Sequence, residues 1–263
     1  MDTRPFSTPA GELTIRESSG AEPALVCLHG FTLHGEMFRT LAVQSGRRIV
    51  APDLPGHGAT SIEPVDLPTT LDGLATWLRE LPGPQVLLGY SMGGRVALHM
   101  AARHPELVRH VIAVSTSLGI VDSIARSRRR EADEQLASHV LEVGVAAFLD
   151  EWSRHPLVGA GQLDAAAAAA DRSLRTQNTA AGLAAALRGL GQGVVPPLSP
   201  AGLHRPVTWV AGELDDRYRT IALAAAAQLG STAAVVPGAG HNVIRDAPDA
   251  IVAIVDDVVS RLS

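Results

Sequence analysis

The 263-residue sequence predicts an α/β fold with a mostly parallel central sheet flanked by helices. Short runs of apolar, β-branched residues alternate with segments of helical length, an order typical of parallel strands joined by crossover helices. Several of these runs are apolar throughout, as expected of strands that are covered on both faces. Glycine and proline mark the connections, for example at residues 55–58, 81–84 and 237–240.

Strands are expected where the apolar runs occur. In chain order these are residues 13–16, 24–28, 48–51, 85–89, 111–114, 207–211 and 233–236. Helices are expected between them and near the end of the chain, at residues 70–80, 92–103, 219–228 and 248–262. The opening segment, residues 1–11, is polar and has no apolar stretch of the kind found in signal peptides, so we expect none there.

The strand pattern stops between about residues 117 and 200, where only helical segments are expected. These are residues 126–143, 145–154, 163–174 and 179–190. The alanine run at 165–170 has the highest intrinsic helix propensity. A block of helices between two strands would most simply cover one end of the sheet. We therefore predict an α/β core made of residues 1–116 and 201–263, with a helical cap at 117–200.

Composition excludes several classes of function. All 22 basic residues are arginine, so no lysine is available for a phosphate-binding loop or a Schiff base. The net charge of −5 argues against a nucleic-acid partner. The single cysteine, Cys27, excludes an internal disulfide and favours a reducing compartment. The apolar stretches fall short of the roughly 18 residues that a membrane span needs, so we expect a cytoplasmic protein without integral membrane contact.

A serine turn stands between the predicted strand at 85–89 and the predicted helix at 92–103. Its sequence, Gly89-Tyr90-Ser91-Met92-Gly93, matches G-x-S-x-G, the pattern that exposes a nucleophilic serine at the end of a sheet. The turn is so tight that side chains at the two glycine positions would collide with the strand or the helix. The helix N-terminus favours negative charge near Ser91. A chance Gly/Ser turn is the alternative.

A catalytic serine needs a base and a group that orients the base. His241 follows the turn at 237–240, directly after a predicted strand, and Asp215 follows another predicted strand. The chain order serine, acid, histidine is the order expected for this architecture. We therefore predict a triad of Ser91, His241 and Asp215. Asp216 is the alternative acid, and an ordinary solvated loop histidine is the alternative interpretation of His241.

Two further loops follow predicted strands. The loop at 29–31 is expected to supply the backbone N–H of Phe31, which with that of Met92 would form an oxyanion hole. The loop at 52–58 contains Asp53 and His57, which we interpret as structural residues of a turn. No metal-ligand spacing is found, and no metal or organic cofactor is expected.

These loops, in this order, resemble those of the α/β-hydrolase superfamily over nearly the whole chain. A narrower resemblance is to 2-succinyl-6-hydroxy-2,4-cyclohexadiene-1-carboxylate synthase, the pyruvate-eliminating enzyme of menaquinone (vitamin K2) biosynthesis. It rests on the segments 89–95, 133–137 with Arg129, Trp152 with Pro156 and Leu157, 174–175 with Asn178 and 182–183, 212–215, and 237–242. The resemblance implies an α/β-hydrolase fold and a carbon–oxygen lyase.

The resemblance also implies a small polycarboxylate substrate, 2-succinyl-5-enolpyruvyl-6-hydroxy-3-cyclohexene-1-carboxylate, which carries three carboxylates. It places Arg95, Arg129 and Arg175 in the site, and a guanidinium binds a carboxylate through paired hydrogen bonds. Tyr90 and Trp152 are expected as pocket walls. For Arg129, an ordinary helix-surface ion pair four residues along the chain is the alternative.

In the implied reaction Ser91 abstracts a ring proton and pyruvate leaves. The alternative is a serine hydrolase acting on an ester, thioester or C–C diketone substrate, and a third possibility is a non-catalytic ligand receptor on the same fold. The sequence departs from the family after Phe31, where Leu33 and His34 replace small residues. We expect these two side chains to alter the mouth of the pocket.

Overall fold

The computed structural model describes residues 1–154 and 164–262. Its centre is an 8-stranded sheet in the order β1-β2-β4-β3-β5-β6-β7-β8. The strands are β1 Asp2–Thr8, β2 Gly11–Glu17, β3 Ala21–Leu28, β4 Arg47–Pro52, β5 Gln85–Tyr90, β6 Val108–Val114, β7 Val207–Gly212 and β8 Thr232–Val236. Pairs from β4 to β8 are parallel, and β1–β2 and β2–β4 are antiparallel. The predicted fold class, including its mostly parallel sheet, is confirmed.

The first strand was not predicted. Residues Asp2–Thr8 pair along their whole length with β2 at the edge of the sheet, and most of their side chains are exposed. An exposed edge strand needs no alternation of apolar and polar residues, and it tolerates a proline such as Pro5. The hydrophobic pattern therefore contained no signal for it. The seven-residue helix α1, Arg39–Ser45, was also missed.

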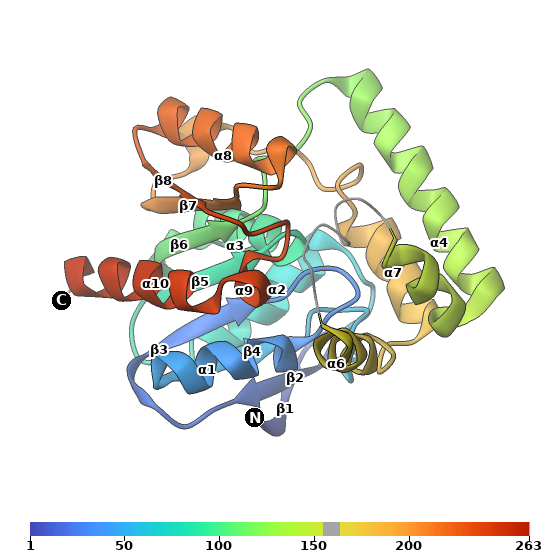
Figure 1. Ribbon diagram of the computed structural model, residues 1–263, viewed down its shortest axis with the longest axis horizontal. Coiled ribbons are helices and arrows are strands. Elements are labelled where there is room, and N and C mark those ends of the chain that lie inside the picture. The colour runs from blue at the N-terminus through green and yellow to red at the C-terminus, as the bar shows by residue number, and fades with distance from the viewer. Residues whose placement is uncertain (155–163, 263) are drawn as a thin grey trace.

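Helices cover both faces of the sheet (Figure 1). One apolar cluster joins the sheet to α2 Leu67–Leu78, α3 Met92–Arg103 and α8 Asp216–Leu229, and the other joins it to α1 and α10 Pro248–Leu262. Short helical turns complete this part of the chain: η1 Gly35–Phe38, η2 Pro105–Leu107, η3 Pro200–Gly202 and α9 Val243–Asp246. The buried clusters hold the strands so that β3, β5, β7 and β8 deliver their carboxyl ends to one edge.

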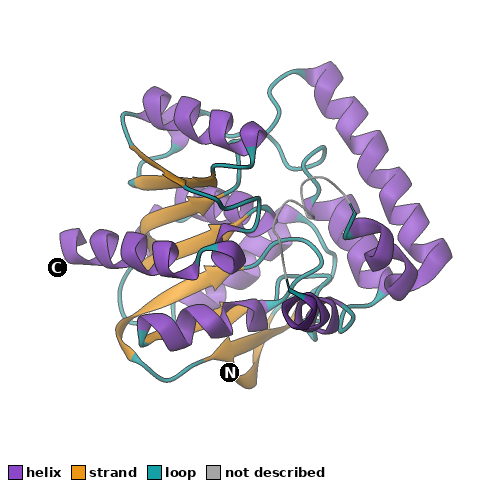
Figure 2. Cartoon of the chain, in the orientation of Figure 1, coloured by secondary structure: helices purple, strands orange, loops and turns teal. Residues whose placement is uncertain are grey.

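The block between β6 and β7 is helical, as predicted. It contains α4 Ser123–Trp152, α6 Ala165–Arg175 and α7 Ala180–Leu190, which lie beside the sheet rather than on its faces (Figure 2). Gly144, with φ of 79°, interrupts α4 at the position where the sequence separated two helices. A third apolar cluster, which includes Val140, Phe148 and Leu183, joins α4 to α7. Pro156 and Leu157, used in the resemblance, lie outside the described residues.

We propose that this inserted block, within residues 117–200, acts as the cap over the core at 1–116 and 201–263. None of the helices in the described ranges combines the length and the hydropathy that a membrane-spanning segment requires.

Candidate active site

Ser91 occupies a strained turn between β5 and α3. Its φ is 52° and its ψ is −108°, a backbone conformation that non-glycine residues rarely adopt outside functional turns. The flanking glycines have the steric role expected from the sequence. A Cβ on Gly89 would lie 2.6 Å from the carbonyl oxygen of Gly93, and one on Gly93 would lie 2.2 Å from that of Leu28. Only glycine fits at either position.

Two hydrogen bonds link Ser91, His241 and Asp215 in a row. His241 Nε2 is 3.2 Å from Ser91 Oγ, and its Nδ1 is 2.6 Å from Asp215 Oδ2. With the proton on Nδ1, the imidazole donates to the carboxylate and accepts from the serine hydroxyl. Asp216 instead pairs with Arg219 at the protein surface. Of the two candidate acids, Asp215 is therefore the one that contacts His241.

The aspartate is itself fixed by the helix that follows it. Asp215 is the N-cap of α8, and its Oδ1 accepts a hydrogen bond of 3.1 Å from the backbone N–H of Tyr218. The Tyr218 ring lies 4.7 Å from the His241 ring, between centroids, and Tyr90 lies 5.5 Å from it. Helix capping and ring packing thus hold both the carboxylate and the imidazole in place.

A buried polar cluster supports the loop next to Ser91. His57 Nε2 accepts from the backbone N–H of Thr32 (3.3 Å), and His29 Nε2 accepts from that of Leu54 (2.8 Å). Burial lowers the pKa of His29 and of His57 to about 3, so both are neutral near pH 7. Asp53 binds Arg16 at 2.9 Å. His29 and His57 thus bind backbone groups of neighbouring loops, and Asp53 binds Arg16, contacts that hold these loops in place.

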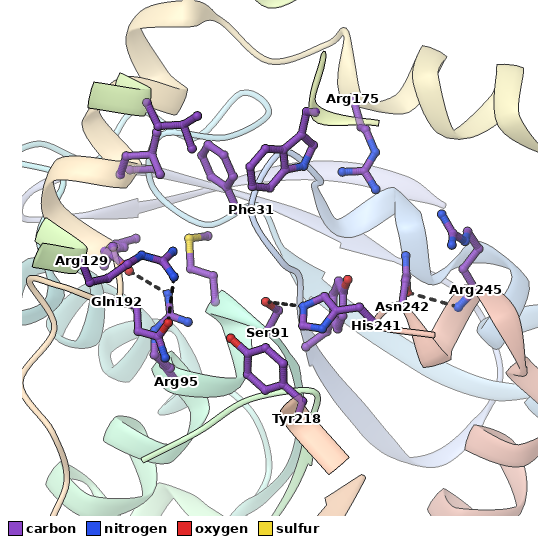
Figure 3. Close-up of a pocket in the computed structure, with 18 residues that line it drawn as sticks. Phe31, Ser91, Arg95, Arg129, Arg175, Gln192, Tyr218, His241, Asn242 and Arg245 are labelled. Carbon is purple, nitrogen blue, oxygen red and sulfur yellow. Dashed lines mark hydrogen bonds between the residues drawn. The ribbon is translucent and has the colours of Figure 1, made fainter. Parts of the chain in front are cut away.

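A pocket opens above Ser91 and contains most of the predicted site residues (Figure 3). Those on its lining are Phe31, Tyr90, Ser91, Met92, Arg95, Arg129, Trp152, Arg175 and His241. Asp215 lies behind the imidazole and does not line the pocket. Met92 directly follows Ser91 and is the first residue of α3.

Aromatic side chains form one wall of this pocket. The Phe31 ring meets the Trp152 ring edge to face, with centroids 5.6 Å apart. Phe148 stacks on Trp152 at 5.7 Å. Because Phe31 belongs to a strand-end loop and Trp152 belongs to α4, this pocket wall joins the helical insertion to the sheet.

The expectation for Leu33 and His34 was wrong. Both side chains are buried, at 1% and 0% exposure, and neither lies on the pocket lining. The ring of His34 contacts the carbonyl oxygen of Leu174 at 3.1 Å. The positive φ of Thr32, 67°, turns the chain inward after Phe31, so the next side chains enter the core instead of the pocket mouth.

The arginine side chains that line the pocket differ in whether they have an acidic partner. Arg129 Nε binds Asp133 at 2.8 Å, and Arg175 Nε binds Asp171 at 2.6 Å. Both are pairs between residues four apart on one helix. Arg175 also donates to the hydroxyl of Thr32.

Arg95 has no acidic partner in the described part of the chain. Its Nη2 donates to the carbonyl oxygen of Leu190 at 3.1 Å, and its Nε makes no hydrogen bond. Burial is the main cause that lowers the pKa of Arg95, which is 8% exposed. A buried guanidinium without a counterion attracts an anionic ligand.

Several lining residues were not predicted. They are Leu136, Ala186, Leu187, Leu190, Gly191, Gln192, Tyr218, Asn242 and Arg245. Two signals were available: Tyr218 stands three residues after Asp215, and Arg245 stands four residues after His241. Gln192, which accepts from Arg129 Nη1 at 3.0 Å, lies in a loop and has no such signal. Among the described residues, no group of three or more His, Cys, Asp or Glu is placed to hold a metal ion.

The sheet order, the strained serine turn and the histidine and aspartate at later strand ends define the α/β-hydrolase architecture. The family model described as "Alpha/beta hydrolase family" matches residues 25–254. The chain therefore belongs to the alpha/beta hydrolase family.

Within this family the chain is similar to 2-succinyl-6-hydroxy-2,4-cyclohexadiene-1-carboxylate synthases. It is 32% identical to a putative synthase of Bacillus subtilis over 94% of this chain and 93% of the relative. It is 31% identical to the Salmonella typhimurium synthase over 88% and 91%. Among solved structures, MenH from S. aureus matches with a TM-score of 0.86 and 26% identity, over 94% of this chain and 98% of that one.

Proposed function

We propose that the protein is a lyase that eliminates pyruvate from 2-succinyl-5-enolpyruvyl-6-hydroxy-3-cyclohexene-1-carboxylate. The product is 2-succinyl-6-hydroxy-2,4-cyclohexadiene-1-carboxylate, an intermediate of menaquinone biosynthesis. Homology to the synthases supports this reaction. The observation that carries the proposal is that the Ser91 hydroxyl, hydrogen-bonded to His241, shares one pocket with the guanidinium groups of Arg95, Arg129 and Arg175.

Each triad residue has a defined task in this mechanism. Ser91 Oγ takes a ring proton from the substrate while its own proton passes to His241 Nε2. Asp215 accepts from Nδ1 and stabilises the imidazolium that results. A serine hydroxyl is a weak base in water, so the step depends on a water-poor, positively charged pocket.

The electrons of the broken C–H bond form a new ring double bond, and the existing ring double bond shifts one position along the ring. The bond between the ring carbon and the enolpyruvyl oxygen breaks in the same movement of electrons. The leaving group departs as the enolate of pyruvate, which takes back a proton to give pyruvate, so atoms and charge balance. In this mechanism the backbone N–H groups of Phe31 and Met92 stabilise the negative charge that develops on a carbonyl oxygen of the substrate.

The arginines account for the choice of substrate. Arg95, without an acidic partner, would bind one carboxylate directly, and Arg129 and Arg175 would bind the others beside Asp133 and Asp171. Tyr90 and Trp152 would hold the ring between them. A small neutral ester has no need of these cations.

A pyruvate-release assay with the purified protein tests the proposal. We expect release from the cyclohexene precursor, and a loss of about 10⁴-fold in kcat in Ser91→Ala, in line with the effect of removing a catalytic triad residue. A fluorophosphonate probe that labels the wild type and not Ser91→Ala would report the serine independently. Hydrolysis of a simple aryl ester without pyruvate release would contradict the lyase and favour a serine hydrolase.

A further inference from the structure

Tyr218 is held rigidly against the acid and the base of the site. Its backbone N–H donates to Asp215, and its ring packs on His241 at 4.7 Å between centroids. The guanidinium of Arg217 lies over the Tyr218 ring, 5.7 Å from the ring centroid. The residue is 5% exposed. The position of the phenol is therefore set by the same contacts that set the triad geometry.

The hydroxyl of Tyr218 takes no part in these contacts, which involve the backbone N–H and the ring. No hydrogen bond to its oxygen occurs among the residues that the structure describes, although buried tyrosine hydroxyls usually find a partner. Figure 3 shows the phenol below Ser91, with its oxygen directed toward Arg95 and the pocket interior. The hydroxyl is thus a hydrogen-bond donor presented to whatever occupies the pocket.

Arg95 faces the same part of the pocket with its charge uncompensated. Within the described chain, the only hydrogen bond of its guanidinium is to the carbonyl oxygen of Leu190. Tyr218 is close enough to affect the ionisation of Arg95 electrostatically. A carboxylate has two oxygens, so it can accept from a guanidinium and from a phenol at the same time.

We propose that Tyr218 is a substrate-binding residue whose hydroxyl, together with the Arg95 guanidinium, binds one carboxylate of the substrate. This inference rests on the proposed function and adds a residue to it. The shared carboxylate would fix the substrate ring relative to Ser91. The contact is expected in both the ground state and the transition state, so it should lower KM rather than raise kcat.

The variant Tyr218→Phe tests this contact, because it keeps the ring packing and the backbone N–H and removes only the hydroxyl. We expect the KM for the cyclohexene precursor to rise about tenfold, the usual effect of losing one hydrogen bond to a charged group. We expect kcat and the rate of Ser91 labelling by a fluorophosphonate to change less than twofold. An unchanged KM would overturn the proposal, and so would a slower labelling rate, which would indicate a role in supporting His241.

A double-mutant cycle shows whether the two groups share one carboxylate. In an Arg95→Met background, Tyr218→Phe should raise KM less than about threefold, because the bound carboxylate is already mispositioned. Independent tenfold effects would contradict a shared carboxylate.

Direct binding separates this inference from the proposed reaction. If the protein releases no pyruvate, titration with succinate by calorimetry still probes the anion site. We expect Tyr218→Phe to weaken succinate binding about tenfold relative to the wild type. Equal binding, or no binding by the wild type, would overturn the inference whatever the reaction.

Discussion

The sheet edge and the helical insertion contribute to the same pocket in different ways. At the sheet edge, backbone geometry places the reacting atoms: Ser91 has a φ of 52°, and the turn around it accepts only glycine at two positions. The insertion instead contributes long side chains with their own counterions. Arg129 comes with Asp133, and Arg175 comes with Asp171.

The difference between the two regions fits the two tasks of the site, which are proton transfer at the sheet edge and carboxylate binding by the insertion. A proton-transfer group must stay within a few tenths of an ångström of its position, so it is attached to strands and tight turns. A group that binds a carboxylate can move, and a neighbouring acid reduces the cost of holding the cation in the empty pocket. Arg95 departs from this division, since it lies on α3 beside the serine and has no acidic partner in the described chain.

The largest expected effect is a loss in the free energy of unfolding at acid pH, caused by two buried histidines at the sheet edge. His29 and His57 have pKa values of about 3 in the folded protein and about 6.5 when unfolded. Below pH 6.5 the unfolded chain therefore binds protons that the folded chain does not, and stability falls as pH falls from 6.5 toward 3. We expect each histidine to contribute a loss of about 2 kcal/mol between pH 7 and pH 5, measured by urea unfolding.

The variant His57→Gln isolates one of these contributions. Its stability at pH 7 should be lower than that of the wild type, but its loss between pH 7 and pH 5 should be smaller by about 2 kcal/mol. A His57→Gln variant with the wild-type pH dependence would show that His57 is not kept neutral by burial.

The next effect compares the unpaired arginine with a paired one. Arg95→Met should lower kcat/KM for pyruvate release about 100-fold, because it removes a buried partner of a substrate carboxylate. The same change should leave the free energy of unfolding unchanged or raise it, because the folded state no longer buries an uncompensated charge.

Arg129→Met is the matched variant. We expect it to lower stability more than Arg95→Met does and to lower kcat/KM less. Asp133 is 3% exposed, so removing Arg129 leaves a buried carboxylate without its ion pair. Unfolding free energy should fall by about 1–3 kcal/mol, whereas kcat/KM should fall only about tenfold. Equal losses of activity in the two variants would remove the distinction between paired and unpaired arginines.

The sequence predicted those parts of the site that depend on local backbone constraints. The glycines around Ser91, and the positions of Asp215 and His241 after strands, follow from rules about tight turns and strand ends. The pocket position of Gln192 depends instead on how the loop after α7 lies against Arg129 of α4, which no local pattern encodes. Strand β1 was missed for a related reason, since its side chains are mostly exposed and carry no alternating pattern.

Asn178 joins the two regions, and its loss should have the smallest of these effects. Its Oδ1 accepts from the backbone N–H of Gly58 at 2.9 Å, and its Nδ2 donates to the carbonyl oxygen of Thr32 at 2.8 Å. Asn178→Ala should therefore lower the free energy of unfolding by about 1–2 kcal/mol and reduce kcat/KM a few-fold. Asn178→Asp keeps the acceptor and loses the donor, so a larger activity loss than in the alanine variant would show that its added charge disturbs Arg175. If both variants match the wild type in urea unfolding, the hydrogen bonds of Asn178 contribute nothing measurable to holding the insertion at the sheet edge.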